Sequence, residues 1–542
     1  MLAQLWPQPL VPFHSLTASS LVAAVPLILV MVLMGGLRKS GLVVSACALA
    51  TTGLLAVFVW HMPAGLAFWS TAFGFVYALL PILWIVFSAL WLYNLSVDTG
   101  NFDQLRQWMQ KHASGDPCIQ AILVAFCFGA LLESCAGFGA PVAVTACLLA
   151  GMGFPARRAV VVALLANTAP VGFGGMGIPI VALAGVTGLD LSKLSAMVGR
   201  QLPILSLLLP CYLCLLVAGR KGLKRAWPAA LITGGSYAVA QLLVSNLWGP
   251  YAADIISALT SIAALVAFLR VWKPSSAASS ENTISAGAAC APESQAQPAP
   301  ASAFTAWLPW TILSAVMVFW SFLKLPEFGQ IKIPVLALHN NVLITLYGKP
   351  YPALYSFQPL AIGTGVLIAT LLAALFLRAR PQAFLKSGVA AWRQLRLPGL
   401  TVMLIVGMAY LYNYSGMAYT LGASMARIGH FFPFVSGYLG WIACFLSGSD
   451  AASNLLFGNL QVAAAHQLHL NPILLAATNS SAGVTGKMIS LQNIAVGVTT
   501  VGLVGEEGKI LCSTFWHSVL LAALIGFIAY AQAYWLQGMI PN

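Results

Sequence analysis

The chain has 542 residues, of which 60% are hydrophobic and only 7% are charged, and its formal net charge is +13. An ordinary soluble domain carries roughly a quarter charged residues, so the composition excludes a soluble fold and indicates a polytopic membrane protein. The positive charge does not require a nucleic-acid partner. If Arg38 and Lys39 face the cytoplasm, the expected crossings place most other Lys and Arg residues on that side, as the positive-inside rule requires.

Apolar runs of about 20 residues, the length that spans a bilayer, recur along the chain. The runs are residues 20–37, 41–60, 66–97, 201–219, 228–247, 251–271, 304–323, 354–377, 400–417 and 519–536. No basic region precedes the first run and no cleavage site follows it, so we expect an uncleaved first helix. The long run 66–97 contains Pro81 and predicts one kinked crossing.

Two polar stretches interrupt the apolar runs. Residues 98–117 place Phe102, Leu105 and Trp108 at helical spacing, which predicts either an amphipathic surface helix or an ordinary loop helix. Residues 273–303 are rich in Pro, Ala and Ser without apolar periodicity and predict a flexible linker. This linker divides the chain into an N-terminal membrane half, 1–272, and a C-terminal membrane half, 304–542.

Two apolar segments, 119–186 and 434–500, are broken repeatedly and do not resemble simple spanning helices. Each has an apolar stretch, a break with an acid and small residues, a second apolar stretch, a turn with Pro, a third stretch and a glycine-rich break that begins at Asn. The first segment is expected to begin inside and the second outside, so they predict inverted repeats, a plan common in secondary transporters. The predicted fold is an all-α polytopic membrane protein with about twelve or more transmembrane segments in two halves.

Two of the chain's twelve acidic residues, Glu133 and Asp450, lie at corresponding breaks inside these segments. A carboxylate within a membrane is costly and is therefore a functional candidate, and burial favours its protonated form, so either residue is suited to proton coupling. The alternative is that both cap broken helices by accepting backbone N–H bonds. Asp254, near the end of an apolar run, is expected to be interfacial.

Lys487 is the only lysine in its apolar segment and follows Gly483 and Gly486. It has three possible roles: binding a substrate carboxylate, balancing Asp450, or extending to an interface. Glycines and half-helix N-termini at the breaks favour an anion, and nearby amides and hydroxyls suit a carboxylate with a neighbouring hydroxyl. The candidate substrate-binding residues are Gly137, Gly139, Asn167, Thr168, Ser453, Asn454, Asn479, Ser480, Ser481 and Lys487.

We expect no cofactor, no metal and no enzymatic activity. The ten cysteines are scattered without metal-ligand spacing, and His466 with His469 forms an HxxH that lacks a third ligand. The string GVTGKM fails the phosphate-loop pattern at Ser481 and Met488. The expected partners are a small monocarboxylate, protons and the lipid bilayer, with no nucleic acid; the oligomeric state is left open.

Four motifs resemble the bacterial L-lactate permease family: ESCAGFGAPVAV from Glu133, ANTAPVGFGGMGIPI from Ala166, SGSDAASNLLFGNLQ from Ser447 and NSSAGVTGKMISLQNIAV from Asn479. The resemblance covers both halves of the chain but not the linker. The chain departs from the family pattern at three places. Ser134 and Cys135 stand where Gly-Ala is usual, and Ala451 and Ala452 stand where hydroxyl residues are usual. Leu491 and Asn493 stand where Pro and Ser are usual.

The resemblance implies uptake of lactate or glycolate by proton symport across a bacterial inner membrane. Two alternatives remain open. A sodium-coupled carboxylate transporter or cation antiporter would use Asp450, Ser453 and Asn454 as cation ligands. A proton-pumping subunit of a redox complex would also contain broken helices.

Overall fold

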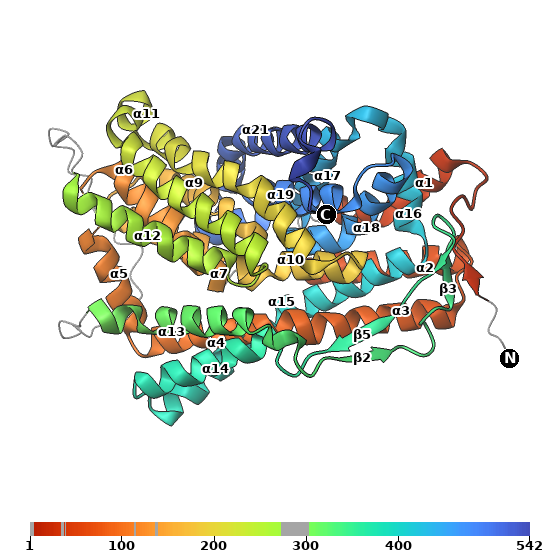
Figure 1. The fold of residues 1–542 in the computed structure, drawn as a ribbon, viewed down its shortest axis with the longest axis horizontal. Helices are drawn as coiled ribbons and strands as arrows, with labels where there is room; N and C mark the ends of the chain where they lie inside the picture. Colours follow the sequence, from red (N-terminus) through yellow and green to blue (C-terminus); the bar gives the residue numbers. More distant parts are fainter. Residues whose placement is uncertain are drawn as a thin grey trace.

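The computed structural model describes residues 5–33, 37, 39–112, 115–135, 139–272, 303–503 and 505–541. These residues form an elongated, largely helical body with a few short strands at one end (Figure 1). Ten of the described helices are long and apolar enough to cross a membrane, and three shorter apolar helices accompany them. The predicted helical membrane fold is therefore confirmed, whereas a total of twelve or more crossings stays a prediction.

The helices of the N-terminal half follow the expected apolar runs. They are, in chain order, α1 (Leu16–Met31), α2 (Gly41–Phe58), α3 (Ala64–Tyr77), the π-helical η2 (Ala78–Leu83), α4 (Trp84–Asp98), α5 (Asn101–His112), α6 (Pro117–Gln120), the π-helical η3 (Ala121–Phe128), α7 (Gly129–Cys135), α8 (Ala140–Gly151), α9 (Ala156–Ala166), the 3-10 helix η4 (Ala169–Phe173), α10 (Gly174–Thr187), α11 (Leu191–Leu247) and α12 (Ala253–Val271).

The C-terminal half is also helical, apart from short strands. Its helices are α13 (Ala303–Phe322), η5 (Leu325–Glu327), α14 (Ile362–Phe376), α15 (Pro381–Tyr414), α16 (Met417–Met425), η6 (Ala426–Phe431), α17 (Phe432–Ser447), α18 (Asp450–Gln467), α19 (Pro472–Lys487), α20 (Leu491–Thr500), α21 (Glu507–Tyr534) and η7 (Gln537–Met539). The strands are β1 (Trp6–Pro7), β2 (Ile331–Pro334), β3 (Val342–Ile344), β4 (Lys349–Pro350) and β5 (Leu354–Phe357).

The strands form two small sheets. β1 pairs in parallel with β3, which pairs antiparallel with β4, while β2 pairs antiparallel with β5 in the register Ile331↔Phe357. The expectation that one helix covers residues 354–377 is wrong at its start, because α14 begins only at Ile362. The residues before it alternate between exposed Leu354 and buried Tyr355, the period of a strand rather than of a helix.

The 57-residue helix α11 is a pair of antiparallel arms that meet at a kink. Ala218 and Gly219 leave helical geometry there, and Gly219 adopts a φ of 62°, which glycine tolerates. Across the two arms, Ser195 Oγ donates to Ser245 O at 2.9 Å. The two separate apolar runs predicted at 201–219 and 228–247 are thus confirmed.

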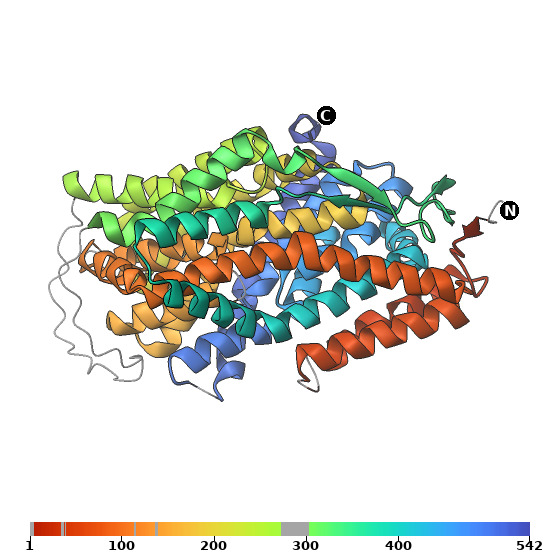
Figure 2. The same cartoon turned by 90° about the horizontal axis from the view of Figure 1, so that it is seen from below.

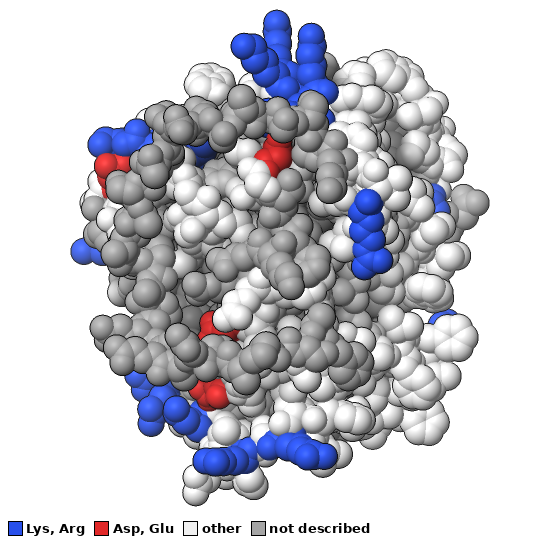
Figure 3. Space-filling view, turned by 90° about the vertical axis from the view of Figure 1, so that its left-hand side faces the viewer, with Lys and Arg blue, Asp and Glu red and all other residues white. Residues whose placement is uncertain are grey.

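Basic residues concentrate at the end of the molecule that contains this kink. Arg220, Lys221 and Lys224 are exposed beside it, and Figure 3, which views that end, shows Lys and Arg side chains along the rim of the face. This is the end that the sequence assigns to the cytoplasm, an assignment that stays a prediction.

The two halves of the chain pack closely on each other. Helix α15 lies along α2, α3 and α4, and α14 lies against α4 (Figures 1 and 2). Gly74 of α3 and Gly407 of α15 permit this approach, because a Cβ at Gly74 would lie 2.7 Å from Gly407 Cα. Except for Ala303, which starts α13, the predicted linker lies outside the described residues, so the division into halves stays a prediction.

Candidate functional site

The first broken segment folds as a helical hairpin that buries Glu133 near its tip. α7 ends at Cys135, and α8 runs back against α7 and η3. Gly139 precedes α8 with a φ of 84°, a left-handed conformation that suits glycine. Only 3% of the Glu133 surface is exposed. Gly137 lies outside the described residues.

The second broken segment has the same form. α18 folds back along α17, and Ser453 Oγ donates to the backbone oxygen of Gly440 at 3.1 Å. The turn uses Gly448 in the left-handed region and Ser449 as the N-cap of α18. Asp450 is therefore the first residue of α18, and it is 2% exposed.

The carboxylate of Glu133 is held by one residue from each half of the chain. Lys487 Nζ, at the end of α19, lies 2.6 Å from Glu133 Oε1, and the lysine and glutamate side chains are only 7% and 4% exposed. Asn167 Nδ2 donates to Glu133 Oε2 at 3.0 Å. An ion pair this deeply buried compensates two charges that the interior would otherwise exclude. The structure shows a role for Lys487 outside the three that the sequence left open: the lysine pairs with Glu133.

Asp450 has uncharged partners in the second half. Ser480 Oγ donates to Asp450 Oδ2 at 2.6 Å, and Asn454 Nδ2 approaches the same oxygen at 3.5 Å. Asp450 Oδ1 has no hydrogen-bond partner among the described residues. The bonds found for Asp450 and Glu133 come from side chains, and the capping bond at the start of α18 comes from Ser449 instead. The geometry therefore favours functional carboxylates over helix caps.

A glycine lies against each carboxylate. A Cβ at Gly174, the first residue of α10, would lie 2.8 Å from Glu133 Oε1, and a Cβ at Gly483 in α19 would overlap Asp450 Oδ1. In each broken segment an acid near a hairpin tip thus contacts a polar side chain and a glycine of the motif that begins at Asn. These contacts are Asn167 and Gly174 for Glu133, and Ser480 and Gly483 for Asp450. The two segments share this arrangement as well as their order of elements.

Further polar contacts connect the halves. Asn454 Nδ2 donates to the backbone oxygen of Pro179 in α10 at 3.0 Å. Asn479 Nδ2 donates to Asn454 Oδ1 at 2.9 Å and lies 3.3 Å from Ser453 Oγ. Ser481 is also fully buried, and its Oγ has no partner among the described residues.

The glycine-rich break predicted from Asn479 to Ser490 is wrong at its start, where Asn479, Ser480 and Ser481 were placed. These residues lie inside the continuous helix α19, which ends only at Lys487, and the chain breaks at residues 488–490. Small and polar residues predict a helix end, but here they occupy the helix face that meets α17 and α18.

A small void lies beside the Lys487–Glu133 pair. The gaps between its lining atoms total about 160 Å³ and leave no room for a water molecule in this conformation. Its lining residues are Val142, Leu164, Asn167, Thr168, Val484, Lys487, Met488 and Asn493. The void thus joins three predicted binding residues from both halves with an apolar wall.

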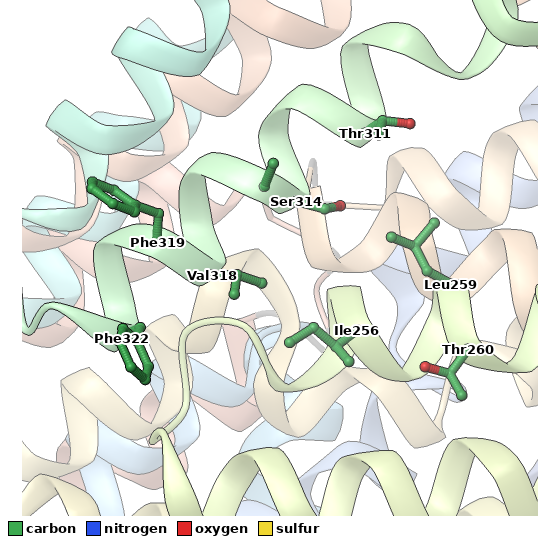
Figure 4. A pocket seen from close by; sticks show the side chains of 9 residues that line it. Ile256, Leu259, Thr260, Thr311, Ser314, Val318, Phe319 and Phe322 are labelled. Carbon is green, nitrogen blue, oxygen red and sulfur yellow. The ribbon is translucent and has the colours of Figure 1, made fainter.

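A much roomier pocket, which is open to the surface and has space for water over about 500 Å³, lies between α12 and α13 and is of a different kind (Figure 4). Its described lining residues are apolar apart from the hydroxyl groups of Thr260, Thr311 and Ser314, and none of them is charged. It therefore lacks the cation that an anionic ligand needs. Within the described part of the chain, no three His, Cys, Asp or Glu residues cluster as metal ligands would.

The sequence model of the L-lactate permease family matches residues 19–536. The chain belongs to this family. The permease is similar to glycolate permease GlcA of Escherichia coli (strain K12), at 40% identity over 99% of this chain and 100% of that protein. It is equally similar, at 40% identity and the same coverage, to L-lactate permease of Bacillus subtilis (strain 168). Among solved structures, the YdaH transporter of Alcanivorax borkumensis matches with a TM-score of 0.46 and 13% identity, over 87% of this chain and 89% of that one.

Family membership confirms the resemblance found in the motifs. The permease is a multi-pass membrane transporter of the lactate and glycolate permease family and not an enzyme. Because the chain belongs to a family of permeases, the alternative of a proton-pumping subunit of a redox complex is set aside.

Two residues of the permease stand out that the sequence did not assign to the site. Asn493 bridges the second hairpin tip to the end of α19, because its Nδ2 donates to Ser490 Oγ at 2.7 Å and to Gly448 O at 3.2 Å. Asp254, expected at an interface, is only 1% exposed and accepts from Tyr237 Oη at 2.9 Å. The sequence feature that could have identified Asp254 is an acidic residue inside an apolar run, the same feature that identified Glu133.

Proposed function

We propose that this permease takes up lactate, or a related 2-hydroxymonocarboxylate such as glycolate, by proton symport across the bacterial inner membrane. One observation carries the proposal: a buried ion pair between Glu133 and Lys487, contributed by different halves of the chain, borders a void with both polar and apolar lining residues. Relatives at 40% identity are named for glycolate and L-lactate, which supports this class of substrate.

The anion would bind through Lys487, the one charged residue among the described residues that line the void. The substrate carboxylate competes with the Glu133 carboxylate for the Lys487 ammonium group. An ammonium group forms its strongest hydrogen bonds with carboxylates. Asn167 and Thr168 provide uncharged donors and acceptors for the 2-hydroxyl group. The side chains of Val142 and Val484 offer an apolar wall for a short carbon chain.

Proton coupling would follow from the same competition. When the substrate carboxylate takes Lys487, the carboxylate of Glu133 loses its compensating charge in a buried environment. An isolated buried carboxylate is costly and takes up a proton instead. One anion and one proton then occupy the site together without net charge, and substrate release restores the ion pair and expels the proton.

Alternating access requires that the site open to each side in turn. We infer that the two hairpins, whose tips carry Glu133 and Asp450, form inverted repeats and that movement of the halves 1–272 and 304–542 exposes the site. Contacts between the halves at the site, such as Asn454 with Pro179, would break and reform during this movement. Asp450, Ser453, Asn479, Ser480 and Ser481 would then support the site from the second half.

A sodium-coupled mechanism is a second candidate, because Asp450 Oδ1 is unpartnered among the described residues and lies among oxygen-bearing side chains. Carboxylate and amide oxygens are suitable ligands for a hard cation. Uptake measured at fixed pH with and without Na⁺ distinguishes the two mechanisms.

The proposed function is tested in proteoliposomes that contain the purified permease and no Na⁺. We expect an inward proton gradient to drive accumulation of labelled L-lactate and glycolate, with a proton ionophore abolishing it. Propionate, which lacks the 2-hydroxyl group of lactate, is the matched competitor and should compete less well. Absence of gradient-driven accumulation of both hydroxy acids refutes the proposal.

A further inference from the structure

The transport cycle described above does not use a third buried acid, Asp254. It lies in the first turn of α12, and the residue is only 1% exposed even though it is close to a helix end. Helices α7 and α11, the π-helical η3 and part of α10 pack around α12 and cover it. A charged carboxylate in such a place requires a cation or several donors.

The contacts of Asp254 fit the protonated form. Tyr237 Oη donates to Asp254 Oδ1 at 2.9 Å, and Gln241 Nε2 donates to the same oxygen at 3.3 Å. Ser206 Oγ in turn donates to Gln241 Oε1 at 2.9 Å, which fixes the orientation of that amide. Asp254 Oδ2 is buried and has no hydrogen-bond partner among the described residues. One oxygen with two donors and one with none is the pattern of a carboxylic acid, with a carbonyl oxygen and a hydroxyl oxygen.

Among the described residues, the surroundings of Asp254 contain acids and no cation. Tyr237 of α11 donates to Asp254, Glu133 of α7 acts on Asp254 electrostatically, and Cys127 of η3 lies near Tyr237. Helices η4 and α10 have no titratable side chain. Glu133 has Lys487 as its partner, whereas no salt bridge to Asp254 is found among the described residues.

We propose that Asp254, held by Tyr237 and Gln241, is a further proton-binding residue of the transport cycle; this inference rests on the proposed proton symport. In the present conformation the proton is bonded to Oδ2. Movement of the first hairpin, whose arm α7 packs on α12, would open Asp254 to water, where the O–H bond breaks and the carboxylate stays behind. The negative charge of Glu133 favours the proton on Asp254 until Glu133 itself takes up a proton.

Two assays on the same proteoliposomes test the proposal. Net uptake under a proton gradient requires that the carrier release its proton, whereas exchange of external labelled lactate for internal unlabelled lactate does not. A positioned proton carrier contributes on the order of a hundredfold to the steps it serves. We expect Asp254→Asn to retain exchange and to lose net uptake by about tenfold or more. The control is Asp190→Asn, an exposed acid at the N-cap of α11, which should retain both activities.

The outcomes are distinguishable. If the wild-type permease shows exchange but no gradient-driven uptake, the proposed symport itself fails. If it shows both and Asp254→Asn also shows both, or loses both, the role of Asp254 is overturned. Tyr237→Phe provides an independent check, because it removes a donor to Oδ1 while it leaves the carboxyl group. We expect its half-maximal net uptake at a higher pH with exchange retained, and an unchanged pH profile overturns the proposal.

Discussion

Replacing Lys487 with methionine removes the cation from the buried pair and leaves the length and packing of the side chain similar. Glu133 then retains Asn167 as a donor at 3.0 Å but has lost the ammonium group at 2.6 Å. Removing one partner of a buried ion pair typically destabilises a protein by about 3–5 kcal/mol, because the other charge stays buried without compensation. The double variant Lys487→Met/Glu133→Gln removes both charges and should recover most of this loss.

Thermal unfolding in detergent, followed by the loss of the monodisperse peak, measures this difference. For a large chain a destabilisation of 1 kcal/mol lowers Tm by about 2 °C, so Lys487→Met should unfold about 6–10 °C below the wild type. The double variant should unfold within about 3 °C of the wild type, since replacement of both partners by neutral groups is often nearly neutral.

The pH dependence of the single variant gives a second measurement. In Lys487→Met the uncompensated carboxylate of Glu133 is relieved by protonation, so the deficit in Tm should shrink as the pH is lowered. The double variant, which has no carboxylate at this position, should show no such trend. A double variant less stable than Lys487→Met, or a single variant as stable as the wild type, would refute the reasoning that the pair is a compensated unit.

Three further predictions concern other parts of the structure. Asp450→Asn retains the acceptor for Ser480 but removes the charge, and we expect it to abolish gradient-driven uptake if Asp450 participates in coupling; uptake equal to the wild type would reduce Asp450 to a structural role. Gly483→Ala places a methyl group against Asp450 and should cost about 1–3 kcal/mol in stability, measured as a fall in Tm, whereas Gly235→Ala, with only one neighbour at 3.9 Å, should be tolerated. On the surface, Arg157 lowers the pKa of Glu506 below its ordinary value, so the pair stabilises the fold above pH 4.5 and this contribution is lost as the pH falls through the lowered pKa. Glu506→Gln should therefore lower Tm slightly at neutral pH, by less in high salt, and not at all in strong acid.

The helices of this permease could be predicted well because their signal is local. Runs of about 20 apolar residues have one stable form in a bilayer, and the kink at Ala218 and Gly219 was marked by the end of one run. The strand β5, which begins at Leu354, was missed because its partner strand β2 lies twenty or more residues earlier in the chain, with Leu354 paired to Pro334. Hydropathy reports an apolar run, but only pairing decides that its first residues are extended.

The site was predicted in part. Glu133 and Lys487 were recognisable as charges in apolar segments, yet they are 354 positions apart, so nothing local indicates that they pair. Asn479 was assigned to a break because Asn and Ser commonly end helices, whereas close packing of α17 and α19 keeps it helical. Asp254 was assigned to the interface because it is near a helix end, and its burial depends on neighbouring helices that the sequence does not place.

The ion pair between the halves also bears on how the protein is made. During synthesis the first half enters the membrane with Glu133 and without its cation, since Lys487 has not yet been translated. A lone charge in the middle of a membrane helix costs about 2.5–3.5 kcal/mol on insertion. The first half must therefore persist as an incompletely compensated intermediate, with Glu133 protonated or hydrated, until α19 arrives. If the two halves are expressed as separate polypeptides, each should be unstable alone and should be stabilised by co-expression of the other. Assembly of the halves, rather than insertion of either one, is then the step that completes the fold.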